Sequence, residues 1–265
     1  MLKNKRIAVT RPKDQQSELI KLLEEQGAIV LSHPIVKIEE MEHKRRIRKI
    51  INLIIKKNAD IVVFTSSNGV KTFLEFAKKI NMFNNLKSEL NRITIAAIGE
   101  KTAEKLSLED INVDLIPKSF TSIDLGKLII QHGVRNKRIF LLRANIATED
   151  LPNMLMEAQA TVISFTIYKV VPEKIENIRK LVDAILAGQI DIIIFTSAFA
   201  VNTLFGYSDR KYYQNLLDYA MEKVKIVAIG PVTQKALESI GFNVNIVAKT
   251  HTIEGIVEEL ISYYK

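Results

Sequence analysis

The chain has 265 residues, enough for one large domain or two medium ones with a substantial core. With 38 Lys and Arg against 30 Asp and Glu, its net charge of +8 favours acidic partners. There is no Cys, which excludes disulfides, thiolate metal sites and Cys nucleophiles. The N-terminal apolar run is too short for a signal peptide, and no run reaches the ~18 apolar residues of a membrane helix. We expect a soluble, cytoplasmic protein with no membrane partner.

Apolar runs typical of buried strands alternate with helical patterns along the chain. Strands are expected at about 6–10, 28–31, 61–64, 93–98, 113–116, 138–142, 161–164, 192–195, 226–229 and 244–247. Helices are expected at about 14–26, 149–157, 173–187 and 252–264. A charged segment at 42–49 opens another helix that runs to 55. Two further helices are expected to end near 80 and at 132, and two more to begin after Gly99 and after Gly230. A polar connector is expected between 80 and 93, and an extended segment at 165–171. This alternation predicts parallel sheets covered by helices.

One stretch of the sequence occurs twice. Residues 60–70 read DIVVFTSSNGV and residues 191–201 read DIIIFTSAFAV, a shift of 131. Other segments match at the same or a neighbouring shift: 95–102 with 226–233, Thr121 with Thr252, and 6–11 with 138–143. Matches in order at nearly one offset predict a single unit repeated along the chain.

The repeat predicts an α/β fold made of two flavodoxin-like parallel-sheet domains from an internal duplication, joined by a two-stranded connector. The first domain would be discontinuous, 1–36 plus 171–265, and the second, 37–170, would be inserted into it. The connector strands are expected near 36–40 and 165–171, because no Ser/Gly-rich linker separates the halves.

Hydroxyl side chains follow the strands of both copies. These residues are Thr65, Ser66, Ser67 and Thr102 in one copy, and Thr196, Ser197 and Thr233 in the other. Free backbone N–H groups and the helix dipole favour an anion at such strand-to-helix turns. Ligands of open parallel sheets bind at the carboxyl ends of the strands, so domains facing one another would line one cleft with these turns. Helix N-capping alone is the structural alternative.

Motifs of other site classes are absent. Gly99-Glu100-Lys101-Thr102 lacks the upstream glycine and the Gly-Lys pair of a phosphate-binding loop, and no Gly-x-Gly occurs. The four His residues lack metal-ligand spacing. The basic run at 44–49 carries no aromatic residues, which favours a solvated helix face over a nucleic-acid contact. We expect no metal, no cofactor and no nucleic-acid partner.

The chain resembles the uroporphyrinogen-III synthase family along almost its full length. The matching segments are VTRP (9–12), FTSSNGV (64–70), AAIGEKTAEKL (96–106), LLR (141–143), TIYKVVP (166–172), FTSAFAV (195–201), AIGPVTQKAL (228–237) and HTIEG (251–255). The resemblance implies two α/β domains joined by a two-stranded connector, with the active site in the cleft. It also implies the reaction: linear hydroxymethylbilane loses water and closes to uroporphyrinogen III, with inversion of the last pyrrole ring.

The substrate implied by this resemblance is a tetrapyrrole polycarboxylate, which suits a positive protein without a cofactor. The hydroxyl residues of the turns carry over as carboxylate-binding positions. Arg11 and Arg143 follow equivalent strands, and each could bind a carboxylate in bidentate fashion or form an inter-domain ion pair. We further expect a monomer, with a transient hand-over from hydroxymethylbilane synthase.

Tyr168 is the residue that the resemblance marks as the acid for the departing hydroxyl. A phenol with a pKa of about 10 is protonated at neutral pH and can donate. Its counterpart in the other copy is Val36, so only one copy carries the phenol. The structural alternative is a connector tyrosine that packs its ring at the domain joint.

Two positions depart from the expected pattern. Ala144 follows Arg143 where the family often has Gly, which makes backbone approach to a ligand less certain there. Glu100 stands where the other copy has Pro231, and its charge weakens the case for a carboxylate at Thr102.

Another function class remains open from the sequence alone. A non-catalytic two-domain protein could bind an anionic metabolite in the same cleft without using Tyr168. Conversion of hydroxymethylbilane to the III isomer separates the enzyme from such a binding module.

Overall fold

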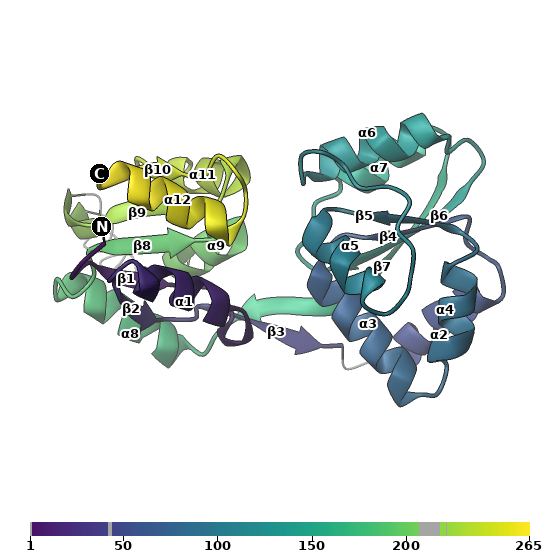
Figure 1. The fold of residues 1–265 in the computed structure, drawn as a ribbon, viewed down its shortest axis with the longest axis horizontal. Helices are drawn as coiled ribbons and strands as arrows, with labels where there is room; N and C mark the ends of the chain where they lie inside the picture. The colour runs from purple at the N-terminus through teal and green to yellow at the C-terminus, as the bar shows by residue number, and fades with distance from the viewer. Residues whose placement is uncertain (1, 42–43, 207–217, 221) are drawn as a thin grey trace. The chain divides into compact units, whose positions relative to one another are not determined.

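The computed structural model describes residues 2–41, 44–206, 218–220 and 222–265 (Figure 1). Two compact units divide the chain: unit 1 comprises Met1–Ile38 and Val171–Lys265, and unit 2 comprises Glu39–Val170. Unit 2 is therefore inserted within the sequence of unit 1. Each unit is built on one five-stranded sheet, which confirms the predicted α/β class with two largely parallel sheets.

Unit 1 has a sheet with the strand order β10-β9-β8-β1-β2, and all its neighbouring strands are parallel. Its elements are β1 (Arg6–Val9), the 3-10 turn η1 (Lys13–Gln15), α1 (Ser17–Glu25), β2 (Ile29–Ser32), α8 (Ile175–Leu186), β8 (Ile192–Phe195), α9 (Ala198–Gly206), β9 (Lys225–Ala228), α11 (Pro231–Glu238), β10 (Ile246–Val247) and α12 (Ile253–Tyr263). Numbered along the chain, this order is 2-1-3-4-5, the flavodoxin-like arrangement.

The core of unit 1 explains why its strands are continuous apolar runs. Leu19 and Leu23 of α1 pack with Ile256 and Leu260 of α12 over one face of the sheet. Every residue of β8 is buried, since helices cover both faces (Figure 1). Parallel strands buried on two sides lose the apolar–polar alternation of a half-exposed strand.

Unit 2 has a sheet with the strand order β3-β7-β6-β4-β5, in which β7, β6, β4 and β5 run parallel. Its elements are β3 (Val36–Glu40), α2 (Lys44–Ile55), β4 (Ile61–Phe64), α3 (Ser67–Lys79), α4 (Phe83–Leu90), β5 (Thr94–Ala97), α5 (Glu100–Ser107), α6 (Ser122–His132), β6 (Arg138–Ala144), α7 (Asp150–Glu157) and β7 (Thr161–Pro172). β3 and β7 both extend across the boundary between the units.

The sheet of unit 2 is also covered on both faces. Leu125 and Ile129 of α6 and Leu155 of α7 pack against alternate residues of β4 and β6. On the other face, Phe73 of α3 meets Phe64 of β4, with ring centroids 6.1 Å apart. The strands matched by the sequence repeat hold equivalent places, because β6-β4-β5 corresponds to β1-β8-β9. A duplication is our interpretation of this match.

Three predicted elements differ from the structure. The prediction of a strand at 113–116 is wrong. Only one residue of this segment, Leu115, forms a parallel bridge, with Ala96 at the sheet edge. The polar connector between 80 and 93 is wrong as well, since it contains α4, which buries Leu86 and Leu90. The strand at 161–164 and the extended segment after it form one strand, β7. Residues 42 and 43 of the expected charged segment lie outside the described residues.

In each unit, an aspartate just before a buried inner strand, β8 or β4, binds the neighbouring strand. Asp191 accepts hydrogen bonds from Arg6 at its backbone N (2.7 Å), Nε (3.0 Å) and Nη2 (2.6 Å). Asp60 accepts the same backbone bond from Arg138 at 2.7 Å, but its side-chain contact to Nε is 3.9 Å. These carboxylates fix the start of the adjacent parallel strands.

Replacing Asp191 with Asn is expected to lower stability in a pH-dependent way. The hydrogen bonds from Arg6 lower the pKa of Asp191, so the ionised carboxylate stabilises the fold above the unfolded pKa of about 3.9. That stability is lost as the pH falls through the lower folded pKa. Urea unfolding of the wild type and of Asp191→Asn at pH 7 and pH 3 measures this effect. The difference between their free energies of unfolding should be smaller at pH 3. A difference of equal size at both pH values contradicts the ionic role, and Asp60→Asn should give a smaller effect.

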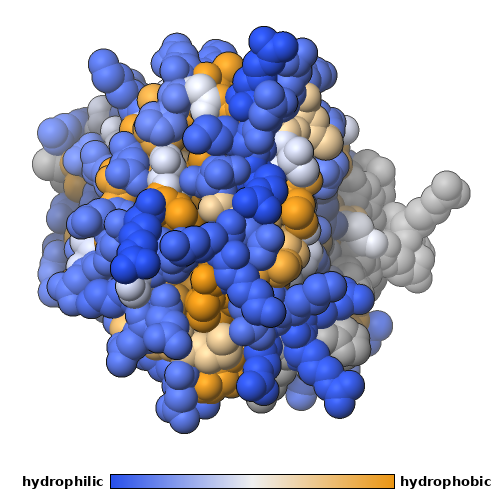
Figure 2. All heavy atoms as spheres, turned by 90° about the vertical axis from the view of Figure 1, so that its right-hand side faces the viewer, coloured by the Kyte–Doolittle hydropathy of each residue, from blue (hydrophilic) through white to orange (hydrophobic). Residues whose placement is uncertain are grey.

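The face shown in Figure 2 is mainly hydrophilic, with smaller hydrophobic areas between the hydrophilic residues. Exposed large apolar side chains are scattered along the described chain, for example Leu108 and Val232. Among the described residues, no helix combines the length and apolar character needed to cross a bilayer.

Candidate functional site

The carboxyl ends of neighbouring strands lie at one edge of each sheet, and the predicted site residues follow them. In unit 2, Phe64 is in register with Ala97 on one side and Leu142 on the other. In unit 1, Ile194 is in register with Val9 and Val227. Polar residues just beyond these strand ends are therefore neighbours in space, although they lie far apart in the sequence.

Ser66 occupies the turn between β4 and α3. Its backbone is extended, and its Oγ accepts a hydrogen bond from the backbone N of Gly69 at 3.0 Å, which makes it the N-cap of α3. Ser67 is the first residue of that helix. The hydroxyl of Thr65 donates to the carbonyl of Leu142 at 3.2 Å and ties the turn to β6. Ser66 thus caps α3, and this cap leaves the hydroxyl proton of Ser66 available to a second group.

That second group is the phenol of Tyr168. Ser66 Oγ and Tyr168 Oη lie 2.8 Å apart, although the residues are separated by 102 positions in the chain. The pairing of β6 with β7 shifts register between Arg143 and Ala144, which places Ala144 opposite Tyr168. This irregularity brings the tyrosine to the strand end where the α3 turn begins.

Burial determines the protonation state of Tyr168. The residue is 5% exposed, and this desolvation raises the pKa of its phenol, while the hydrogen bond with Ser66 acts in the opposite direction. The phenol therefore keeps its proton at neutral pH. In this resting state the phenol can donate that proton.

Gly69 makes room for this pair. A Cβ at position 69 would lie 3.1 Å from Ile167 Cδ1, 3.2 Å from Ser66 Oγ and 3.6 Å from Tyr168 Cε1. In unit 1 the equivalent position is Ala200, whose backbone N is capped by Ser197 Oγ at 3.1 Å. The two turns share the cap and differ in the glycine, which accompanies the copy that carries the tyrosine.

Arg143 is engaged within unit 2. It is 6% exposed, and its Nη2 donates to the carbonyl of Ala147 at 2.5 Å and to Glu149 Oε1 at 2.6 Å. Glu149 neutralises the guanidinium, so an inter-domain ion pair is not needed to explain its burial.

Arg11, at the equivalent strand end of unit 1, has a different environment. Its Nη2 donates to Gln15 Oε1 at 3.3 Å, and the structure gives it no salt bridge to a described residue. Its Nε and the Nε2 of Gln15 are both buried without a hydrogen-bond partner among the described residues. Desolvation lowers the pKa of the Arg11 guanidinium, although arginine remains charged in proteins.

The remaining hydroxyl residues lie at helix starts. Ser197 caps α9, and Thr196 precedes it directly after β8. Thr102 in α5 and Thr233 in α11 are 4% and 3% exposed. Glu100 is exposed at the first position of α5, which keeps its charge near the turn that precedes Thr102.

The structure brings some predicted residues together and leaves others apart. Within unit 2 it joins Ser66 directly to Tyr168, with Thr65 tied to the intervening strand β6. It gives no hydrogen bond between any two of the predicted unit 1 residues Arg11, Thr196, Ser197 and Thr233 among the described part of the chain. The sequence reading missed Gly69, Gln15 and Glu149. Gly69 could have been noticed because the repeat aligns it with Ala200. No pattern in the sequence marks Gln15 or Glu149 as a site residue.

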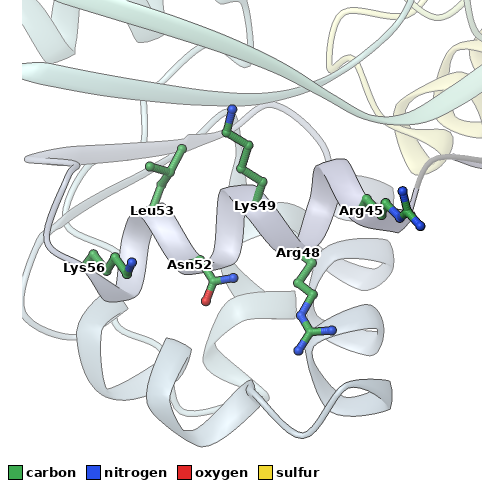
Figure 3. A pocket seen from close by; sticks show the side chains of 6 residues that line it. All are labelled: Arg45, Arg48, Lys49, Asn52, Leu53 and Lys56. Atoms are coloured by element: carbon green, nitrogen blue, oxygen red, sulfur yellow. The ribbon is translucent and has the colours of Figure 1, made fainter.

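A separate hollow of about 330 Å³ runs along α2 and contains none of the predicted site residues. Figure 3 shows its lining side chains projecting from one helix: Arg45, Arg48, Lys49, Asn52, Leu53 and Lys56. The opposite side of α2 is buried through Ile47, Ile50, Ile51 and Ile54. The exposure of the basic side chains agrees with the predicted solvated helix face.

Over the described residues, no group of His, Asp and Glu could hold a metal ion.

Comparison with known proteins supports one family. The family model for uroporphyrinogen-III synthase HemD matches residues 17–258. A putative uroporphyrinogen-III synthase of Methanothermobacter thermautotrophicus is 27% identical over 259 residues, covering 96% of each chain. The uroporphyrinogen-III synthase of Chlorobaculum parvum is 26% identical over 245 residues, covering 92% of each chain.

Solved structures share the fold. A crystal structure of a mutant uroporphyrinogen III synthase from the extremely thermophilic bacterium Thermus thermophilus matches with a TM-score of 0.72 at 23% identity, covering 98% of each chain. The Helicobacter pylori enzyme matches with a TM-score of 0.62 at 16% identity, covering 98% of this chain and 99% of that one. Because the family model spans most of the sequence, the chain belongs to the uroporphyrinogen-III synthase family, whose enzymes cyclise hydroxymethylbilane.

Proposed function

We propose that this chain closes hydroxymethylbilane to uroporphyrinogen III and that Tyr168 protonates the departing hydroxyl. The observation that carries the proposal is the 2.8 Å hydrogen bond between Ser66 Oγ and Tyr168 Oη at a strand end. Ser66 already accepts from the backbone of Gly69. The pair can form with either hydroxyl as donor, and in this proposal Ser66 donates its own proton to the phenolic oxygen, which leaves the phenol proton for the substrate.

The reaction balances with one proton cycled through Tyr168. The phenol protonates the hydroxyl, the C–O bond breaks, and water leaves with both electrons of that bond. The adjacent pyrrole nitrogen stabilises the cationic carbon. The far terminal pyrrole ring forms a C–C bond to this carbon through the α-carbon that already carries its methylene bridge, which gives a spiro intermediate. The bond between that α-carbon and the old bridge then breaks, and the released methylene, stabilised as a cation by its own pyrrole, bonds to the free α-carbon of the inverted ring. That α-carbon loses its proton, which restores the phenol. Ser66 stabilises the transient phenolate, because its hydrogen bond strengthens as negative charge develops.

The carboxylates of the substrate are bound at the strand-end turns in this proposal. Thr65, Ser66, Ser67 and Thr102 serve in unit 2, and Thr196, Ser197 and Thr233 serve in unit 1. Helix N-termini bind carboxylates through backbone N–H groups without a dedicated cation at each one. Arg11 adds a cation in unit 1, whereas Glu149 engages Arg143 at 2.6 Å and reduces its attraction for a carboxylate.

Isomer analysis tests the function. Purified protein is incubated with hydroxymethylbilane, and the products are oxidised and separated as porphyrin isomers. We expect uroporphyrin III, whereas spontaneous closure in a protein-free control gives the uninverted isomer. A product mixture identical to that control contradicts the enzyme and leaves the binding module, which the family comparison does not favour.

We also propose that the chain works as a cytoplasmic monomer that receives its substrate from hydroxymethylbilane synthase. The support is chemical, since a substrate that closes spontaneously to the wrong isomer benefits from a short transit. Sedimentation of the protein alone tests the monomeric state, and sedimentation of its mixture with that synthase tests the association needed for hand-over. A stable oligomer of the protein alone contradicts the first.

A further inference from the structure

We propose that Arg11 and Gln15 form a carboxylate-binding subsite in unit 1, which deepens the proposed function by naming where one acidic side chain of the substrate is held. The subsite rests on that function, because the substrate class there is a polycarboxylate. Its evidence lies within unit 1 and consists of two buried donors without acceptors.

The side chains of Arg11 and Gln15 contact each other and leave one donor on each without a partner among the described residues. Gln15 presents Oε1 to Arg11 Nη2 at 3.3 Å, so the amide orientation is fixed: the opposite orientation would place two donors against each other. Gln15 Nε2 and Arg11 Nε then lack partners among the described residues. A buried donor without an acceptor carries its full desolvation penalty. One carboxylate, with two acceptor oxygens, relieves both penalties at once.

Side-chain hydrogen bonds hold the turn that carries Arg11. Gln16 is 2% exposed, and its Nε2 donates to the carbonyl of Arg11 at 2.6 Å. Ser32 donates to the Oε1 of Gln16 from β2. The backbone beneath Arg11 is therefore fixed, and only the side chains need to move to admit a ligand. A pre-ordered turn reduces the entropy lost on binding.

Arg11 and Arg143 differ in their hydrogen-bond partners. Both arginines follow equivalent strands, yet Arg143 donates to Glu149 at 2.6 Å, and the structure gives Arg11 no such carboxylate among the described residues. Asp14, Glu18 and Glu254 attract Arg11 through space. Unit 2 thus supplies the acceptor from its own chain, and unit 1 leaves that place to a ligand.

The test uses Gln15→Glu, which offers Arg11 an internal carboxylate of nearly the same shape. Binding of uroporphyrin III, a stable polycarboxylate porphyrin, is measured by titration, and steady-state kinetics with hydroxymethylbilane are measured in parallel. We expect the Kd and the KM to rise about tenfold or more, with kcat changed by less than about twofold. The thermal midpoint should rise, because an orphaned donor gains an acceptor.

Two further variants remove the cation of the subsite and control for the added negative charge. Arg11→Gln should weaken uroporphyrin III binding similarly. Gln189→Glu adds the same charge to an exposed residue before β8, at the opposite sheet edge of unit 1, and should leave binding unchanged. Unchanged Kd values in both Gln15→Glu and Arg11→Gln overturn the subsite. A wild-type protein that binds uroporphyrin III through Arg11 but forms no isomer III overturns the proposed function alone.

Discussion

Replacing Tyr168 with Phe is expected to slow formation of the III isomer about a hundredfold, the lower range for loss of a general acid. The ring and its packing remain, and only the hydroxyl 2.8 Å from Ser66 is removed. The KM should change little, because the carboxylate-binding turns are untouched. Rapid quenching followed by isomer separation measures the rate apart from spontaneous closure.

The pH profile separates proton donation from simple packing. Burial raises the pKa of Tyr168 above its ordinary value of about 10, so wild-type activity should show no loss from phenol ionisation up to that pH.

Tyr263→Phe, at a residue 47% exposed, is the matched control for Tyr168→Phe and should keep full activity. An undiminished rate in Tyr168→Phe removes the phenol as the acid and leaves the alternative in which the ring only packs.

Replacing Gly69 with Ala is expected to reduce activity about tenfold and to destabilise the fold by roughly 1–3 kcal/mol, typical of overpacking. The added methyl would lie 3.1 Å from Ile167 Cδ1 and 3.2 Å from Ser66 Oγ, so the serine and the β7 residues beside the phenol must shift. Isomer assays and urea unfolding measure the two effects separately.

Gly126→Ala provides the matched control for that prediction. Its Cβ would be equally close to neighbours, 3.2 Å from Met154 Cε and 3.3 Å from Leu151 Cδ1, but it touches no residue of the proposed site. We expect a comparable change in stability with normal turnover. Equal losses of activity in the two variants would mean that the Gly69 effect is general destabilisation and not displacement of Tyr168.

Much of the fold could be predicted from the sequence because buried parallel strands leave a strong local pattern. β4 and β8 are fully apolar runs, and the structure places each between two neighbouring strands inside a sheet. Elements with weak local patterns were missed. α4 begins with Phe-Asn-Asn and buries few side chains, and the segment around Leu115 pairs at one residue only.

The site was predictable to the level of strand ends but not of contacts. Each copy of the repeat placed hydroxyl residues after a strand, which follows from chain order alone. The contact between Ser66 and Tyr168 also depends on the order β7-β6-β4 and on the register shift beside Ala144. The different roles of Arg11 and Arg143 depend on Glu149, whose side chain reaches back six residues to Arg143.

The most direct measurement is a crystal structure of the protein with a bilane in which the terminal hydroxymethyl group is replaced by methyl, so that ring closure cannot occur. The account predicts that this methyl carbon lies within about 3.5–4 Å of Tyr168 Oη, where a hydroxyl on it would receive the phenol proton. A bound bilane whose methyl end lies far from Tyr168, with the Ser66–Tyr168 hydrogen bond undisturbed, would contradict it.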